Sequence, residues 1–233
     1  MDNLWIAALD APDRRRIEPH LEERSFEHGQ LLFDMGEDVD AVWFPMSGVV
    51  SLMTVLPDDR MVETAVVGRE GLVGVTCGPF NARAASRAIC QLDGVAACCP
   101  ADVFGAALNE SPALREALSR FTEGLMAQVQ QTAACNARHQ LDERLARWLL
   151  ALRDRTDGDR FDLTQADIAG MLGVRRATVS EVGAELEGRD LIRRGRGWVE
   201  IADRRALERA ACGCYRQMRD IMAALEQPQP EAA

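Results

Sequence analysis

Residues 161–201, FDLTQADIAGMLGVRRATVSEVGAELEGRDLIRRGRGWVEI, form the most specific stretch of this 233-residue chain. Thr164 is placed to cap a short helix, and Gly173 permits the turn that follows it. A second helix is expected to begin near Arg175 and to turn its apolar side chains inward, namely Val179, Val182 and Leu186. Two short helices around a glycine turn predict a helix-turn-helix.

The residues after this motif predict a two-stranded wing. Residues 191–194 and 198–201 read as strands on either side of the turn signal Gly195-Arg196-Gly197. Residues 189–196 hold four Arg and one Asp, so the tip of the hairpin is strongly basic. A basic hairpin beside a helix-turn-helix suits contact with a nucleic-acid backbone.

The outward face of the second helix carries residue types that can read base edges. Arg176 suits the O6 and N7 acceptors of guanine, and Glu181 suits the amino group of cytosine. Arg175 and Thr178 point sideways, towards the phosphates. We therefore predict double-stranded DNA as the partner, with the following contact residues: Thr164, Gln165, Arg175, Arg176, Ala177, Thr178, Ser180, Glu181, Arg193, Arg194 and Arg196.

Upstream of this module the residue pattern of the sequence changes twice. Residues 4–24 are expected to be helical, whereas residues 30–100 carry short apolar runs separated by glycines, which is typical of an antiparallel roll. Ser111-Pro112 is a helix start, because Ser caps well and Pro is tolerated at the first helical position. A long helix is expected to follow.

That long helix carries an apolar stripe at spacings of three and four residues: Leu114, Leu118, Phe121, Leu125 and Val129. Such a stripe suits pairing with a second copy of the chain, and we predict a dimer interface there. Packing of the same stripe on the chain's own roll is an open alternative, and a helix of this length offers faces for both.

Together these elements predict an α+β fold: an N-terminal antiparallel β-roll of the jelly-roll kind, a long dimerisation helix and a C-terminal winged helix-turn-helix domain. The expected domains are a roll that serves as sensor with its flanking helices (1–110), the dimerisation helix (111–138), the DNA-binding domain (139–226) and a disordered tail (227–233).

Composition and charge limit the class of protein. The net charge is −10, but the first 138 residues hold nearly all of the acidic excess, so a local basic face on the second part can still bind phosphates. No run approaches the roughly 20 apolar residues of a membrane span, and the N-terminus lacks a secretion signal. The sequence therefore predicts a cytoplasmic protein with no membrane partner. No phosphate loop, HExxH or nucleophile elbow is present, so we do not expect an enzyme.

Seven cysteines, an odd number without an export signal, predict reduced thiols. The closest pairs, Cys98-Cys99 and Cys212-x-Cys214, lack the spacing of familiar zinc motifs, so we predict small buried side chains and no metal site. The histidines, His20, His28 and His139, show no spacing that marks a haem ligand.

The order of roll, long helix and winged helix-turn-helix resembles the Crp/Fnr family of bacterial regulators over nearly the whole chain. Residues 31–53 resemble the strands of the family's roll, residues 110–121 the entry to its dimerisation helix, and residues 164–192 its DNA-binding segment. The resemblance implies a homodimer, a signal received in the roll, and RNA polymerase as a further partner. Many relatives have Glu then Arg where this chain has Ala177 and Glu181, so its DNA target should differ from theirs.

The effector pocket that the resemblance implies departs from the family pattern. Members that bind cyclic nucleotide usually carry Gly-Glu-Leu and then Arg-Ser/Thr-Ala, whereas this chain has Gly-Leu-Val-Gly at 71–74 and Arg-Ala-Ala-Ser-Arg-Ala at 83–88. Because the Glu that takes the ribose hydroxyl is absent, ordinary cAMP binding is not expected, although Arg83 or Arg87 can meet an anion. The predicted pocket residues are Gly71, Val73, Gly74, Arg83, Ser86 and Arg87.

The cofactor stays unknown at this stage. Oxygen-sensing members of the family hold an iron–sulfur cluster on N-terminal cysteines, and the first cysteine here is Cys77. An alternative function is a thiol sensor that uses one or more cysteines of the roll, such as Cys77 or the pair Cys98-Cys99.

Overall fold

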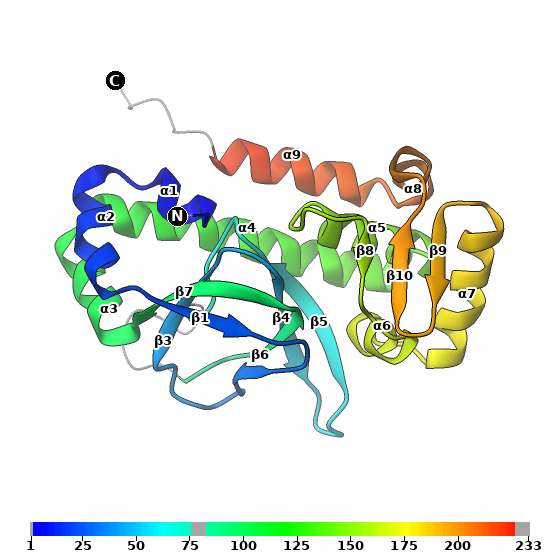
Figure 1. Ribbon diagram of the computed structural model, residues 1–233, viewed down its shortest axis with the longest axis horizontal. Helices are drawn as coiled ribbons and strands as arrows, with labels where there is room; N and C mark the ends of the chain where they lie inside the picture. Colours follow the sequence, from blue (N-terminus) through cyan, green and yellow to red (C-terminus); the bar gives the residue numbers. More distant parts are fainter. Residues whose placement is uncertain (1, 76–82, 227–233) are drawn as a thin grey trace.

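A computed structural model describes residues 2–75 and 83–226 and shows two bodies joined by one long helix (Figure 1). The N-terminal body is a roll of two antiparallel sheets. One sheet has the order β1 (Glu22–Phe26), β7 (Gly94–Pro100), β3 (Ala41–Pro45). The other has the order β2 (Leu31–Phe33), β6 (Arg87–Leu92), β4 (Val49–Val55), β5 (Met61–Val67). The predicted antiparallel roll is confirmed.

Helices cover one end of the roll: α1 (Leu4–Ala8), α2 (Ala11–Ile17), the 3-10 helix η1 (Glu18–His20) and α3 (Ala101–Glu110). The prediction that residues 22–24 are helical is wrong. They belong to β1, where Glu22 lies opposite Cys98 of β7, because pairing with a distant strand overrides the local helical pattern.

The long helix α4 (Pro112–Arg138) begins as predicted, since the side chain of Ser111 accepts a hydrogen bond from the amide of Leu114. The apolar stripe of this helix packs at least partly on the chain's own roll. Leu114 and Leu125 are buried, and Leu118, Phe121 and Val129 are half-buried against the same cores. The open alternative is therefore observed, and the role of the stripe in a dimer stays a prediction.

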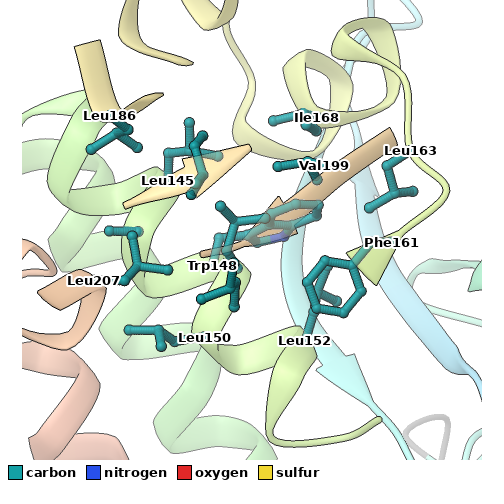
Figure 2. Close-up of a cluster of buried hydrophobic side chains, with 14 of the residues drawn as sticks. Leu145, Trp148, Leu150, Leu152, Phe161, Leu163, Ile168, Leu186, Val199 and Leu207 are labelled. Carbon is teal, nitrogen blue, oxygen red and sulfur yellow. The ribbon is translucent and has the colours of Figure 1, made fainter. Parts of the chain in front are cut away.

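The C-terminal body is a winged helix-turn-helix. Its elements are α5 (Leu141–Arg153), β8 (Arg160–Phe161), α6 (Gln165–Leu172), α7 (Arg176–Gly188), β9 (Ile192–Gly195), β10 (Trp198–Ile201) and α8 (Arg204–Ala210), with the strands in the order β8-β10-β9. Figure 2 shows Trp148 of α5 in the middle of its core, flanked by Leu145, Phe161 and Val199. None of the helices in residues 2–75 and 83–226 is long and apolar enough to span a membrane.

The last helix, α9 (Cys214–Glu226), runs back along α4 towards the N-terminal body (Figure 1). Gly124 of α4 makes this close approach possible, because a Cβ atom at that position would lie 3.0 Å from the sulfur of Met222. The C-terminal segment therefore packs on the helix that carries the roll.

The roll and the winged body share a buried junction. Val49 and Val66, from the outer face of the β4–β5 sheet, belong to the same apolar cluster as the core of the winged body. Trp148 donates a hydrogen bond to Glu63 of β5 at 2.8 Å. The position of the winged body is thus set partly by the roll.

Candidate nucleic-acid interface

The first helix of the motif, α6, is held by a capping box. The hydroxyl of Thr164 accepts from the amide of Asp167, and the carboxylate of Asp167 accepts from the amide of Thr164. Gly173 ends the helix with φ +65°, a left-handed conformation that favours glycine. The predicted cap and turn are confirmed, and Thr164 and Gln165 occupy the start of α6.

The second helix, α7, begins at Arg176 with Arg175 as its N-cap. Val179 and Leu186 are buried in the winged core, as predicted. The outward face holds the predicted base-reading residues: Arg176, Ala177 and Glu181 are exposed, and Ser180 and Thr178 are half-buried. Helix α7 lies at the end of the molecule farthest from α1 and α2 (Figure 1).

Arg175 lies on a different side of the motif. It lines an open cavity of about 610 Å³ between the turn of the motif and the β4–β5 hairpin, together with Val62 and Gly173. A Cβ atom on Gly173 would lie 3.0 Å from Val62 of β5. The start of α7 therefore faces the chain's own roll.

The arginines of the wing are held to different degrees. Among the described residues, Arg193 forms only a 3.8 Å ion pair with Glu200. The side chain of Arg193 is 69% exposed, and Arg196 is exposed in the turn that Gly197 closes with φ +84°. Arg194 instead donates to the carbonyl of Ser180 at 2.9 Å and to the carboxylate of Glu187 at 3.0 Å.

The prediction that Arg194 contacts DNA is therefore corrected, because its guanidinium lies across α7. A Cβ atom at Gly183 would lie 2.8 Å from Nη1 of Arg194, so glycine provides the space that this side chain occupies. Arg194 holds the wing against α7.

One basic residue of this surface lies outside the motif that the sequence revealed. Arg160 of β8 is exposed, and its guanidinium lies over the ring of Trp198 at 4.3 Å from the ring centre. Because β8 pairs with β10, this residue lies beside the wing. Local sequence carries no signal for it, since the two-residue strand has no periodicity to detect.

Three of the six predicted effector residues, Gly71, Val73 and Gly74, lie in closely packed surroundings. Gly71 and Val73 serve packing, since a Cβ atom on Gly71 would lie 2.2 Å from the ring of Phe121 and Val73 is buried. Gly74 has φ +105° and sits against the carbonyl of Ala41.

The arginines of that predicted pocket differ from each other. Arg87 is paired in bidentate fashion with Asp34, at 2.8 and 2.6 Å, so the prediction that it is available to an anion is corrected. Arg83 is exposed and Ser86 is half-buried, and their role stays a prediction.

The described cysteines of the roll are buried among apolar side chains. Burial raises the pKa of Cys90 and Cys98 to about 12 and that of Cys99 to about 11, so these thiols stay neutral and poorly nucleophilic at pH 7. Their environment does not support the thiol-sensor alternative. Cys77, its other candidate, lies outside the described residues.

The remaining described cysteines are buried, as predicted, but they lie together. Cys135, Cys212 and Cys214 meet at the end of α4, together with His139. No local pattern in the sequence indicates this cluster, because its two halves lie more than 70 residues apart.

Comparisons with known proteins agree with this architecture. Residues 23–111 match the family model of the cyclic nucleotide-binding domain, and residues 143–210 match that of the Crp-like helix-turn-helix domain. The nitrogen fixation regulation protein FixK of Bradyrhizobium diazoefficiens is 26% identical over 217 residues, which cover 88% of each chain.

Solved structures share the fold. FixK2 from Bradyrhizobium japonicum superposes with a TM-score of 0.71 at 19% identity, over 83% of this chain and 98% of that one. A transcriptional regulator of the CRP family from Thermus thermophilus gives a TM-score of 0.68 at 22% identity, over 81% of this chain and 96% of that one.

A roll of the cyclic nucleotide-binding type, joined by a long helix to a winged helix-turn-helix, defines a class of DNA-binding transcription regulators. The chain belongs to this class as a member of the Crp/Fnr family. Members of this family regulate transcription and are not enzymes, in agreement with the sequence analysis.

Proposed function

We propose that the chain acts as a homodimer on a twofold symmetric DNA site, with α7 of each protomer in the major groove. The exposed face of α7 supports this proposal most directly, because it offers Arg176 and Glu181 to base edges, and neither side chain is tied to another of the described residues by a hydrogen bond or ion pair. Arg175, Arg193 and Arg196 are then phosphate contacts on either side of that face.

Dimerisation would use the face of α4 that the roll and α9 leave open. Its exposed residues recur at helical spacing: Arg115, Ser119, Thr122, Met126, Gln130, Ala133 and Ala137. Met126 is 53% exposed, which is unusual for a large apolar side chain, and its small neighbours allow a second helix to approach closely. This face adjoins the apolar stripe, about 100° around the same helix.

The roll would receive a signal that changes DNA binding, with RNA polymerase as the further partner on the promoter. Leu72 stands where cyclic-nucleotide binders carry the ribose-binding Glu, and it is 1% exposed among the apolar side chains of the helical end of the roll. This environment supports a signal other than ordinary cAMP.

The base-reading role of Arg176 is tested by Arg176→Ala, with Arg15→Ala in α2 as a control that removes the same charge far from α7. We expect Arg176→Ala to weaken binding to the selected specific duplex by about 1–3 kcal/mol and to leave a random duplex nearly unchanged. Fluorescence anisotropy at fixed salt measures both affinities.

Equal losses on the specific and the random duplex would contradict base reading by Arg176. Sedimentation of the unmodified chain tests the dimer separately: we expect twice the 25.7 kDa of one chain, and a monomer at micromolar concentration would contradict the proposed assembly.

A further inference from the structure

Four potential metal ligands converge where the long helix ends. Cys135 lies in the last turn of α4, His139 is its C-cap, and Cys212 and Cys214 stand at the start of α9. One ligand atom from each residue lies within 4.8 Å of every other. Sγ of Cys135 is 3.9 Å from Sγ of Cys212, and Sγ of Cys214 is 3.8 Å from Nδ1 of His139.

We propose that Cys135, His139, Cys212 and Cys214 form a tetrahedral site for a single thiolate-preferring divalent metal ion, zinc above all. Zinc bonds of about 2.3 Å to sulfur and 2.0–2.1 Å to nitrogen give tetrahedral edges of about 3.5–3.8 Å, close to the separations found. A multi-iron cluster would hold its ligand atoms farther apart, because each would bind a different iron. The site lies apart from the exposed face of α7 and goes beyond the proposed DNA binding.

The fold brings together two pairs of ligands, and the members of each pair are close in the sequence. Cys135 and His139 are four residues apart, so they share one side of the last helical turn, and the amide of His139 donates to the carbonyl of Cys135. Cys212 and Cys214 flank Gly213 at the opposite end of the site. Because α9 packs along α4, the second pair lies directly beside the first.

Two arginines of α5, Arg144 and Arg147, interact electrostatically with the cysteines of the cluster. Arg144 is 9% exposed and donates to the carbonyl of Leu172, but its Nε and that of Arg147 have no hydrogen-bond partner among the described residues.

A divalent ion with three thiolates and a neutral imidazole carries one net negative charge. Arg144, which is buried, and Arg147, which is half-buried, are suited to offset that charge, because a buried charge is costly without a partner of opposite sign. Burial of the three sulfurs also keeps bulk water from competing as a ligand.

A bound metal ion would link the start of α9 to the end of α4, next to the start of α5. The C-terminal body would then be fixed to the long helix by metal–ligand bonds as well as by packing. Because the metal binds the folded chain and not the unfolded one, it also raises the melting temperature.

The test is a titration of the reduced, metal-free full-length chain with Co²⁺ under anaerobic conditions, followed by competition with Zn²⁺. We expect one equivalent of Co²⁺, with intense ligand-field bands of tetrahedral cobalt and near-ultraviolet thiolate-to-cobalt absorption. Zn²⁺ should displace it with a Kd below about 1 µM and raise the melting temperature by several degrees.

Variants locate the site. Cys212→Ser is expected to lose the tetrahedral spectrum, whereas Cys98→Ala in the roll should keep one full equivalent as the matched control. His139→Cys provides a fourth thiolate and should retain binding with stronger charge-transfer absorption, so the proposal does not depend on a variant that only loses structure.

Three outcomes would overturn the proposal. They are uptake of well under one equivalent by the unmodified chain, a weak octahedral cobalt spectrum, or a tetrahedral spectrum that survives intact in Cys212→Ser. Iron and sulfide in the purified protein, or a Cys135–Cys212 disulfide in protein isolated under reducing conditions, would also overturn it, because each assigns the cluster a different chemistry.

Discussion

The two faces of one sheet in the roll are both buried, yet they are composed very differently. On the inner face of β4, Val50 and Leu52 pack with Cys90 of β6 in an apolar cluster. On the outer face of the same strands, Ser51, Glu63 and Gln91 are buried beneath the winged body. The inner face therefore stabilises the roll by hydrophobic burial, whereas the outer face adds directional hydrogen bonds to the apolar contacts of Val49 and Val66 with the winged body.

The protons of the outer face can be counted. The hydroxyl of Ser51 lies 2.6 Å from Oε2 of Glu63 and 2.9 Å from Oε1 of Gln91, but it has one proton to donate. With the Gln91 amide placed as it is, a protonated Glu63 donates to Ser51, which then donates to Gln91. Burial raises the pKa of Glu63 to about 7, in agreement with this arrangement.

Truncation of the inner face should have the largest effect. Leu52→Ala removes a side chain that is 5% exposed and leaves a cavity, so we expect a loss of about 2–5 kcal/mol in the free energy of unfolding. Urea unfolding measures the change. Leu56→Ala, at a leucine that is 40% exposed, is the control and should stay within about 0.5 kcal/mol. Equal losses for both variants would remove the contrast between core and surface.

Removal of the titratable group from the outer face should have an effect that depends on pH. The pKa of Glu63 in the folded chain, about 7, lies above its ordinary value of 4.5, so its contribution to stability is present below about pH 4.5 and is lost as pH rises through 7. In Glu63→Gln this dependence is absent. From pH 5 to 8, the stability of the natural chain should fall by up to about 3 kcal/mol relative to that of the variant.

Chemical unfolding at several pH values tests this expectation, with Glu116→Gln at an exposed position as the control. Parallel pH profiles for the natural chain and Glu63→Gln would show that Glu63 titrates normally. The junction between roll and winged body would then contain an ordinary carboxylate, and the proton count above would fail.

The exposed rim of the same junction, formed by Arg69 and Asp157, should contribute least to the free energy of unfolding. Arg69 and Asp157 join the two bodies at 3.2 Å, but their side chains are 37% and 88% exposed. Water screens such a pair, so Asp157→Ala should change the free energy of unfolding by no more than about 0.5 kcal/mol. A loss above about 1 kcal/mol in urea unfolding would mean that the rim, rather than the buried outer face, holds the two bodies together.

Features encoded by adjacent residues were predictable. The caps at Ser111 and Thr164 and the turn at Gly173 follow from local backbone chemistry, and the inward face of α7 follows from helical periodicity. The alternating strands of the roll belong to the same group.

Features that depend on distant contacts were not predictable. A stripe such as Leu114 and Leu125 shows that a helix buries one face, but not whether its own roll or a second chain covers it. Nothing local distinguishes Arg194, which binds the carbonyl of Ser180, from the exposed Arg193. Cys135 and Cys212 meet because α9 packs back along α4. Their separation in the sequence does not predict this packing.

The return of α9 also has a consequence for the order of events during synthesis. The surface of α4 around Gly124 is covered by Met222, which is among the last described residues of the chain. That surface therefore stays open to water until α9 has left the ribosome. The packing around α4 is thus completed only after the winged body has been translated, and truncation before α9 would leave apolar surface exposed on α4.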